Sequence, residues 1–304
     1  EPMSMLKIMD RHTDWAVLIC LIGGGQEIHT GEAGLREWGR ALEEHFLHWH
    51  AFVSPQLQEG ADGPVGQTLL AGESPLDVTA DADLHLGVSI RCFRTTALSR
   101  WVENVLGNRP EDAMAAMMAL QNYPIVMTRS LAEARSWLQS RARGLRRCGL
   151  VASSGAKRLR RFGVDVDGKN EPEHWFLADH EDVRSSTYLE VAATEFDIQG
   201  LEVDWAGLCW DADLRRADSG WRCMRFRGTR WENIRGEADQ QYLLNKYRVL
   251  LTRAREGVVI WVPPGDARDA YSLPAWYDEL AGYLTRCGVT NLSSEPALER
   301  SENA

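Results

Sequence analysis

Short runs of apolar residues alternate with helical patterns along much of the chain. These runs are rich in β-branched and large side chains, and each ends at glycine, proline or polar residues. Strands that alternate with helices are typical of βα units, which build a mostly parallel sheet flanked by helices. The pattern therefore predicts an α/β fold. The expected strands cover residues 15–22, 124–128, 149–153, 203–210 and 258–262.

Two helices have clear signals in the sequence. Ser130 and Glu133 form a capping box, because each side chain can satisfy a backbone N–H of the first turn. A second helix is predicted over about residues 238–253, directly before a strand. The composition of residues 54–83 indicates a linker or surface excursion, and that of residues 164–182 an acidic loop insertion. The apolar face of the first helix is predicted to consist of Leu131, Ala134, Leu138, Ala142 and Leu145.

The charge of the chain excludes one class of protein. Its 304 residues include 34 Lys and Arg against 44 Asp and Glu, so its net charge of −10 does not suit a protein that coats nucleic acid. Residues 141–162 differ from the chain as a whole in charge, because they include eight basic residues and no acidic one. This segment is either a nucleic-acid track, in which residues 153–155 could hold a phosphate, or a solvated helix face.

The six cysteines are scattered without a C-x-x-C pair. Cys20, Cys148 and Cys209 lie inside predicted strands, which favours reduced core residues in a cytoplasmic protein. No apolar run is long enough to span a bilayer and no signal peptide is evident, so no membrane partner is expected. His45 and His48 lie one helical turn apart but lack a second ligand pair, which favours a surface helix over a zinc site.

Three segments lie where a strand or helix ends, which is where open α/β sheets bind ligands. In residues 21–28, Gln26 follows three glycines and could bind a phosphate oxygen, or the run could be a tight turn. Glu202, in a polar loop before a strand, could bind a ribose hydroxyl or merely cap a turn. Arg253 lies beside an apolar stripe, so its guanidinium should be partly buried and needs a triphosphate or a structural carboxylate.

Taken in order, these segments resemble the motifs of superfamily 1 helicases. Gly-Gly-Gly-Gln at 23–26 looks like motif III, residues 84–91 with the helix after them are similar to motif IV, and residues 194–202 look like motif V. Leu-Leu-Thr-Arg-Ala-Arg at 250–255 looks like motif VI. The wider sequences around motifs III and V most resemble the domain-of-unknown-function 2075 family, a helicase-like ATPase group akin to the motor of Schlafen proteins.

The resemblance implies RecA-like domains that bind ATP and Mg²⁺, with single-stranded DNA or RNA as the partner. It implies that Gln26 senses the terminal phosphate and that Arg91 and Arg253 act on it as arginine fingers. The residues expected around the rest of the nucleotide, with Glu202 at the ribose, are Gly25, Gly200, Glu202 and Thr252. The residues expected at the nucleic acid, the first from motif V and the others from the basic segment, are Thr194, Lys157, Arg158 and Arg160.

A helicase motor also needs a phosphate loop, G-x-x-x-x-G-K-[ST], and an acidic magnesium ligand. The closest match, residues 163–170, ends in Asn170 where a hydroxyl is required, and it follows a basic helical segment instead of a strand. We therefore expect the P-loop in the remainder of a longer polypeptide. Residues 1–50 are then the tail of a first RecA-like domain, residues 51–83 the linker or surface excursion, and residues 84–304 a second RecA-like domain.

The expected function is that of the C-terminal part of an ATP-dependent nucleic-acid helicase or translocase. Such a chain supplies phosphate-sensing and arginine-finger residues to an incomplete ATP and Mg²⁺ site, and is inactive as an ATPase alone. The alternative is a non-catalytic RecA-like module that binds nucleic acid or protein. A stand-alone phosphotransferase that uses residues 163–170 is a remote third reading.

Overall fold

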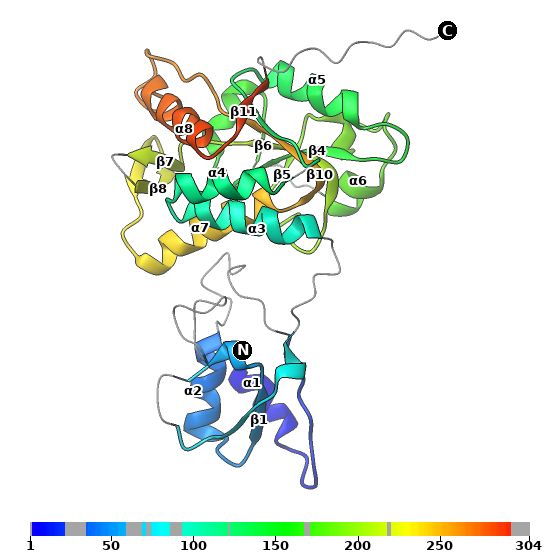
Figure 1. Cartoon of the computed structure of the whole chain (residues 1–304), viewed down its shortest axis with the longest axis vertical. Helices are drawn as coiled ribbons and strands as arrows, with labels where there is room; N and C mark the ends of the chain where they lie inside the picture. The colour runs from blue at the N-terminus through cyan, green and yellow to red at the C-terminus, as the bar shows by residue number, and fades with distance from the viewer. Residues whose placement is uncertain are drawn as a thin grey trace. The chain divides into compact units, whose positions relative to one another are not determined.

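The computed structural model describes residues 2–21, 35–58, 69–70, 74–85, 93–120, 122–166, 171–217 and 220–292. The chain forms two units, Glu1–Ile90 and Arg91–Ala304, drawn in Figure 1. Each unit buries apolar side chains of its own, and each is described separately below.

The first unit places two helices beside a pair of short parallel strands. Leu6 of the first helix and Leu42 and Phe46 at the second form the centre of its small core. The second strand lies within the range expected as a linker or surface excursion, and it pairs in register with the first. These elements are α1 (Pro2–Met9), α2 (Leu35–His45), β1 (His50–Val53) and β2 (Asp77–Ala80), with short 3-10 turns η1 (Pro55–Leu57) and η3 (Ala82–Leu84).

The strand expected over residues 15–22 is wrong for residues 15–21, which form neither a strand nor a helix, and residue 22 lies outside the described part. Trp15 is 78% exposed and Ile19 82% exposed, and the Cys20 side chain is exposed too, so its predicted core position is also wrong. The physical reason is that an alternating apolar pattern makes a strand only where a neighbouring strand satisfies its backbone. No described residue forms such a neighbour here.

The second unit is built on a six-stranded parallel sheet with the strand order β11-β3-β10-β6-β4-β5. All residues of β3 and β4 are buried, as expected for parallel strands that are covered on both faces. The α/β class and the four strands predicted after residue 120 are confirmed. The strands are β3 (Ile125–Thr128), β4 (Cys148–Ala152), β5 (Ala192–Ala193), β6 (Val203–Cys209), β10 (Ala254–Trp261) and β11 (Thr290–Asn291).

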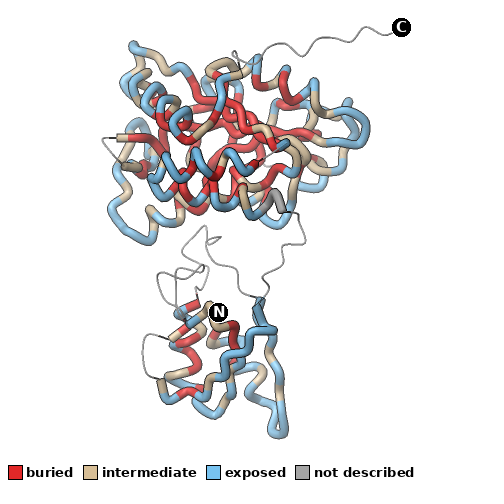
Figure 2. The backbone as a smooth tube through the Cα atoms, in the orientation of Figure 1, coloured by how far each residue is buried: buried red, intermediate tan, exposed pale blue. Residues whose placement is uncertain are grey.

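Helices lie on both sides of this sheet (Figure 1), and the buried residues concentrate along the strands and the helix faces turned toward them (Figure 2). One side is covered by α5, whose Leu138 packs with Leu150 of β4. Gly149, the residue before Leu150 in β4, faces α6, because a Cβ there would lie 2.5 Å from the Trp175 ring. The helices are α3 (Phe93–Leu106), α4 (Pro110–Met118), α5 (Leu131–Arg141), α6 (Pro172–Leu177), α7 (Glu237–Leu251) and α8 (Pro274–Arg286).

Half of the capping box predicted for α5 is confirmed: the bond to the Ser130 hydroxyl forms, but the Glu133 carboxylate and the Ser130 N–H both bind the Thr128 hydroxyl instead of each other. The Glu133 N–H donates to the Ser130 hydroxyl oxygen at 3.3 Å. The Glu133 carboxylate accepts from the Thr128 hydroxyl at 2.5 Å, and the Ser130 N–H donates to that same hydroxyl oxygen at 3.1 Å. The predicted place of Leu145 on the helix face is wrong, since α5 ends at Arg141 and Leu145 is 99% exposed. Gly144, with φ +66°, lies in the turn that follows.

A three-stranded antiparallel sheet lies between β6 and α7 in the sequence. Its strands are β7 (Leu214–Ala217), β8 (Gly220–Arg227) and β9 (Arg230–Asn233). The predicted helix after it is α7, which buries Leu243, Tyr247 and Leu250. Among the described residues, no helix is long and apolar enough to cross a bilayer.

Candidate functional site

The predicted site residues that the structure describes fall at the two ends of the parallel sheet. At the amino end, Glu202 and Arg253 directly precede the neighbouring strands β6 and β10. The Val203 N–H donates to the Arg253 carbonyl oxygen at 3.0 Å, which joins the two segments where the strands begin. Gly200, with φ +83°, supplies the left-handed turn before β6. The structure thus gathers Gly200, Glu202, Thr252 and Arg253 at the amino end of two central strands.

The Arg253 side chain is 3% exposed, so the burial predicted from its position beside the apolar stripe is confirmed. A guanidinium removed from water needs favourable polar or anionic surroundings. Thr252 comes directly before it, and its hydroxyl donates to the carbonyl oxygens of Arg248 (2.9 Å) and Val249 (3.1 Å). These bonds close the last turn of α7 and fix the point from which Arg253 enters β10.

The Glu202 carboxylate has a partner within the chain. Its Oε2 accepts a hydrogen bond from Arg255 Nε at 3.1 Å, and its side chain is only 15% exposed. Burial first, and the Glu202 charge second, raise the pKa of Tyr123 well above its usual range. The Tyr123 hydroxyl donates to the Ala254 carbonyl oxygen at 3.0 Å, at the beginning of β10. Glu202 therefore stabilises the amino end of the sheet, where β6 and β10 begin.

Three predicted residues, Gly25, Gln26 and Arg91, lie outside the described residues, and their roles stay predictions. The same holds for residues 167–170 of the closest phosphate-loop match. Its first residue, Gly163, has φ +80° and ends the 3-10 helix η4 (Lys157–Phe162). The segment thus follows a basic helical turn, as predicted, and not the strand that a phosphate loop requires.

Thr194 lies at the opposite, carboxyl end of the sheet, directly after β5. Its backbone N–H and its hydroxyl both donate to Asp197 Oδ2, at 2.7 and 2.9 Å. The Thr194 residue is 7% exposed. Both of these donors are therefore used to shape the turn that carries the chain from β5 towards β6.

Next to it, Glu195 forms a buried ionic cluster that the sequence interpretation missed. Its carboxylate is fully buried and accepts from the Ser154 N–H at 2.8 Å and the Ser154 hydroxyl at 2.6 Å. Lys246 Nζ of α7 lies 2.7 Å from Glu195 Oε1. Residues 153–155 were one candidate site for a phosphate, but the anion that the Ser154 N–H holds is the Glu195 carboxylate. A phosphate contact at this N–H is therefore not supported.

The basic segment continues into η4, where all three arginines are ion-paired. Arg158 and Arg161 both contact the Asp269 carboxylate, and Arg160 Nη2 lies 2.9 Å from Asp165 Oδ2. Arg160 remains 68% exposed as a side chain, and Lys157 is exposed as well. Lys157 and Arg160 are thus the outward cations of this turn, with Arg160 also paired to Asp165, whereas Arg158 and Arg161 share the Asp269 carboxylate.

Two buried aspartates follow β6 at the same end of the sheet. Tyr277 donates its hydroxyl to Asp211 Oδ1 at 3.0 Å, and Tyr247 donates to Asp213 Oδ1 at 2.5 Å. Burial, and then repulsion from Asp211, raise the pKa of Asp213 to about 7, although hydrogen bonds from Ser153 and Tyr247 act in the opposite direction. Asp213 is therefore a carboxyl group that gains or loses its proton near neutral pH.

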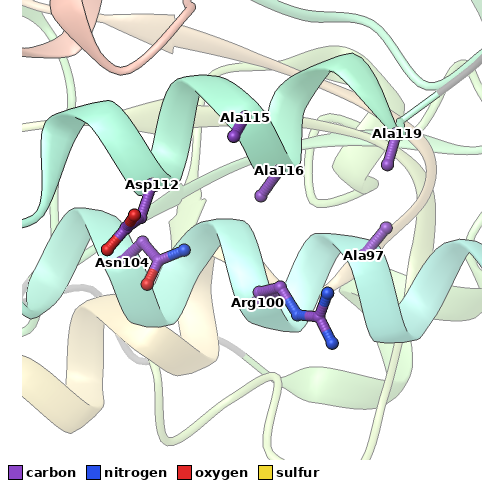
Figure 3. A pocket seen from close by; sticks show the side chains of 7 residues that line it. All are labelled: Ala97, Arg100, Asn104, Asp112, Ala115, Ala116 and Ala119. Atoms are coloured by element: carbon purple, nitrogen blue, oxygen red, sulfur yellow. The ribbon is translucent and has the colours of Figure 1, made fainter.

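A groove of about 440 Å³ runs between α3 and α4 (Figure 3). Alanines form most of its wall, and Arg100, Asn104 and Asp112 supply its polar groups. None of the predicted site residues lines it. Within the described ranges, no group of three or more His, Cys, Asp or Glu side chains could hold a metal ion, and His48 instead contacts Asp10 at 2.6 Å.

A family model matches most of the chain. The model of the family described as Schlafen group 3, DNA/RNA helicase domain, matches residues 1–264 of the chain. This range includes both ends of the sheet described above. No curated protein matches the chain.

Proposed function

The chain belongs to the Schlafen group 3 DNA/RNA helicase domain family, and on that premise we propose that it is the C-terminal part of an ATP-dependent nucleic-acid helicase or translocase. In this proposal Arg253 and Arg91 are arginine fingers, Gln26 senses the terminal phosphate, and Gly25, Gly200, Glu202 and Thr252 border the nucleotide. The phosphate loop belongs to other residues, because the sequence contains no G-x-x-x-x-G-K-[ST].

The observation that carries the proposal is the buried position of Arg253 between α7 and β10, beside the loop that ends in Glu202. A planar guanidinium with several N–H donors suits charge that spreads over a transferring phosphoryl group. A buried guanidinium also acts through a lower effective dielectric than one in water. The proposal assigns the Mg²⁺ ligands to the part of the protein that carries the phosphate loop.

ATP hydrolysis tests the catalytic part of the proposal. The pure chain is expected to show no ATP turnover, since it lacks a phosphate loop. Turnover by the pure chain that Lys169→Ala abolishes would overturn the proposal, because Lys169 is the lysine of the closest phosphate-loop match. A colorimetric phosphate assay with and without a single strand is sufficient.

Measurements of nucleic-acid binding test the proposed contacts between η4 and a single strand. Lys157 and Arg160 are the outward cations of η4, so the double variant Lys157→Gln/Arg160→Gln is expected to bind a labelled single strand about tenfold more weakly. The slope of log affinity against log salt should become shallower by about 1.4, or about 0.7 for each lost phosphate contact. Fluorescence anisotropy at several salt concentrations measures both. The matched control is Arg36→Gln/Arg40→Gln, which removes the same charge from two exposed positions of α2, outside the basic segment, and it should retain the wild-type slope.

The internal partners of Glu202 and Thr252 favour a second candidate function, a non-catalytic RecA-like module that binds nucleic acid or protein. The two functions differ in their response to nucleotide. A helicase part that is joined to its phosphate-loop domain changes its affinity for single strands when a non-hydrolysable ATP analogue is added. A binding module keeps one affinity in either condition.

A further inference from the structure

Four aromatic side chains form a connected surface, here called the aromatic face, at the carboxyl end of the parallel sheet. The Phe226 ring of β8 packs edge-to-face on Trp231 of β9, with centroids 5.0 Å apart, and on Tyr271, at 6.1 Å. Trp231 Nε1 also donates to the Tyr271 carbonyl oxygen at 2.9 Å. Trp276 of α8 joins the same surface through a shared arginine. Tyr271 is 39% exposed, and the other three rings are half-buried.

Arginines lie among these rings. The Arg215 guanidinium lies 3.7 Å from the Trp276 centroid and 5.9 Å from that of Trp231, and Arg158 of η4 lies 5.3 Å from the Phe226 centroid. Arg215 is 7% exposed, yet its Nη1 has no hydrogen-bond partner among the described residues. A buried, unsatisfied guanidinium N–H is costly, which indicates that this surface is incomplete without a further acceptor.

The strand register adds a second unfavourable feature. Arg215 of β7 is paired directly with Arg222 of β8, so two like charges leave the same face of the sheet from opposite positions. Burial, and next the charge of Arg222, lower the pKa of Arg215 to about 10. Within the fold alone, this pair destabilises the antiparallel sheet. An anion bound beside it would relieve the repulsion.

The charge of the antiparallel sheet favours a polyanion. Residues 214–235 contain seven arginines against two acidic residues, in a chain with a net charge of −10. Arg225 and Arg230 are ion-paired with Asp239 and Glu232, and Arg158 with Asp269. Arg222, Arg227 and Arg235 have no ion pair among the described residues. Arg222 and Arg235 line a hollow of about 410 Å³ together with Asn233 and Gln240.

We propose that the aromatic face stacks the bases of a single-stranded nucleic acid, while Arg222 and Arg235 hold its phosphates in the adjoining hollow. Rings and guanidinium planes side by side suit this ligand, because every base offers a flat face and every linkage a negative charge. The inference rests on the proposed function, since it adds a base-stacking surface to the nucleic-acid contacts of η4. Arg158 contacts both regions, because it lies in η4 and over the Phe226 ring.

The stacking part is tested with Tyr271→Ala and two labelled single strands, one normal and one with abasic sites. This variant keeps the backbone carbonyl that Trp231 uses, so the sheet retains its bond. Wild type should bind the normal strand more tightly than the abasic strand. Tyr271→Ala should bind the normal strand about tenfold more weakly and the abasic strand with unchanged affinity, and Tyr271→Phe should behave as wild type.

Two matched controls accompany this experiment. Tyr188→Ala removes a tyrosine that is 42% exposed elsewhere on the same unit, and it should leave both affinities unchanged. Arg222→Gln should weaken both strands and make the salt slope shallower by about 0.7, whereas Arg100→Gln, in the groove of Figure 3, should not.

The outcomes separate this inference from the proposed function. If the chain binds single strands and loses affinity on Lys157→Gln/Arg160→Gln, but Tyr271→Ala binds both strands as wild type does, the aromatic face is not a stacking surface and the proposed function stands. If wild type binds no single strand, both are wrong. Circular dichroism of each variant verifies that its fold is intact.

Discussion

At the scale of single residues, Glu195 is a charge that its own chain encloses fully. Its carboxylate holds the loop after β4 through Ser154 and neutralises Lys246 of α7. Glu195→Gln leaves the Lys246 ammonium without its anion at a largely buried position. We expect the free energy of unfolding to fall by about 3 kcal/mol, measured by urea denaturation.

The control for this change is Glu190→Gln, an exposed carboxylate five residues earlier, which should shift the free energy by less than about 0.5 kcal/mol. A double variant, Glu195→Gln/Lys246→Met, should lose less than the sum of its two single changes. Strict additivity of the two losses would show that the pair does not interact.

The raised pKa of Asp213 predicts how the stability of the fold depends on pH. Its pKa is raised from 3.8 to about 7 in the fold, first by burial and then by Asp211. Between these values the folded protein holds a proton that the unfolded chain has released, so the free energy of unfolding falls as pH rises. The slope is at most about 1.4 kcal/mol per pH unit, and it flattens above the folded-state pKa. In Asp213→Asn, this contribution should vanish when urea unfolding is measured across the window.

Residue-level prediction from sequence worked where the local pattern determines the environment. The burial of Arg253 followed from its position beside an apolar helical stripe. Glu195 could not be found in this way, because its partner Ser154 lies 41 residues earlier and only the folded sheet brings them together. Its neighbour Thr194 was singled out instead, on a resemblance that says nothing about local hydrogen bonds.

Among the elements, α5 shows how a local signal fixes a helix end. The Ser130 hydroxyl accepts the Glu133 N–H, so Ser130→Ala should lower the free energy of unfolding by about 1 kcal/mol. Ser140→Ala, in the same helix, is the matched control. The Ser140 hydroxyl donates to the Trp137 carbonyl, and removing this interior bond should have an effect near zero. Equal losses for the two changes would contradict a capping role for Ser130.

Strand prediction succeeded or failed according to the neighbours that each segment finds. The runs that became β3, β4, β6 and β10 are enclosed by parallel partners and helices. Residues 15–21 carry a similar pattern but meet no partner strand among the described residues, and Trp15 and Ile19 are exposed. β5 and β11 contain only two residues each, which is too short to give a periodic signal. The apolar pattern shows which side chains a segment can bury, and they are buried only where other strands and helices of the fold pack against that segment.

For the whole molecule, the α/β class and the parallel sheet could be predicted from alternation alone. The family match over residues 1–264 supports the helicase-like interpretation as a class. The finer roles stay predictions, both for Gly25, Gln26 and Arg91, which lie outside the described residues, and for Gly200, Glu202, Thr252 and Arg253, which lie together at the amino end of the sheet. The stacking surface was not predictable, because Phe226 and Trp231 lie about 40 residues before Tyr271 and Trp276 in the chain.

The hydrogen bond from the Val203 N–H to the Arg253 carbonyl oxygen has a mechanical consequence. Together with the contact between Arg255 and Glu202, it attaches the beginning of β6 to the beginning of β10 at two points. Neither segment can shift along its strand without pulling the other with it. A displacement of α7 would therefore move Arg253 and Glu202 together relative to the parallel sheet.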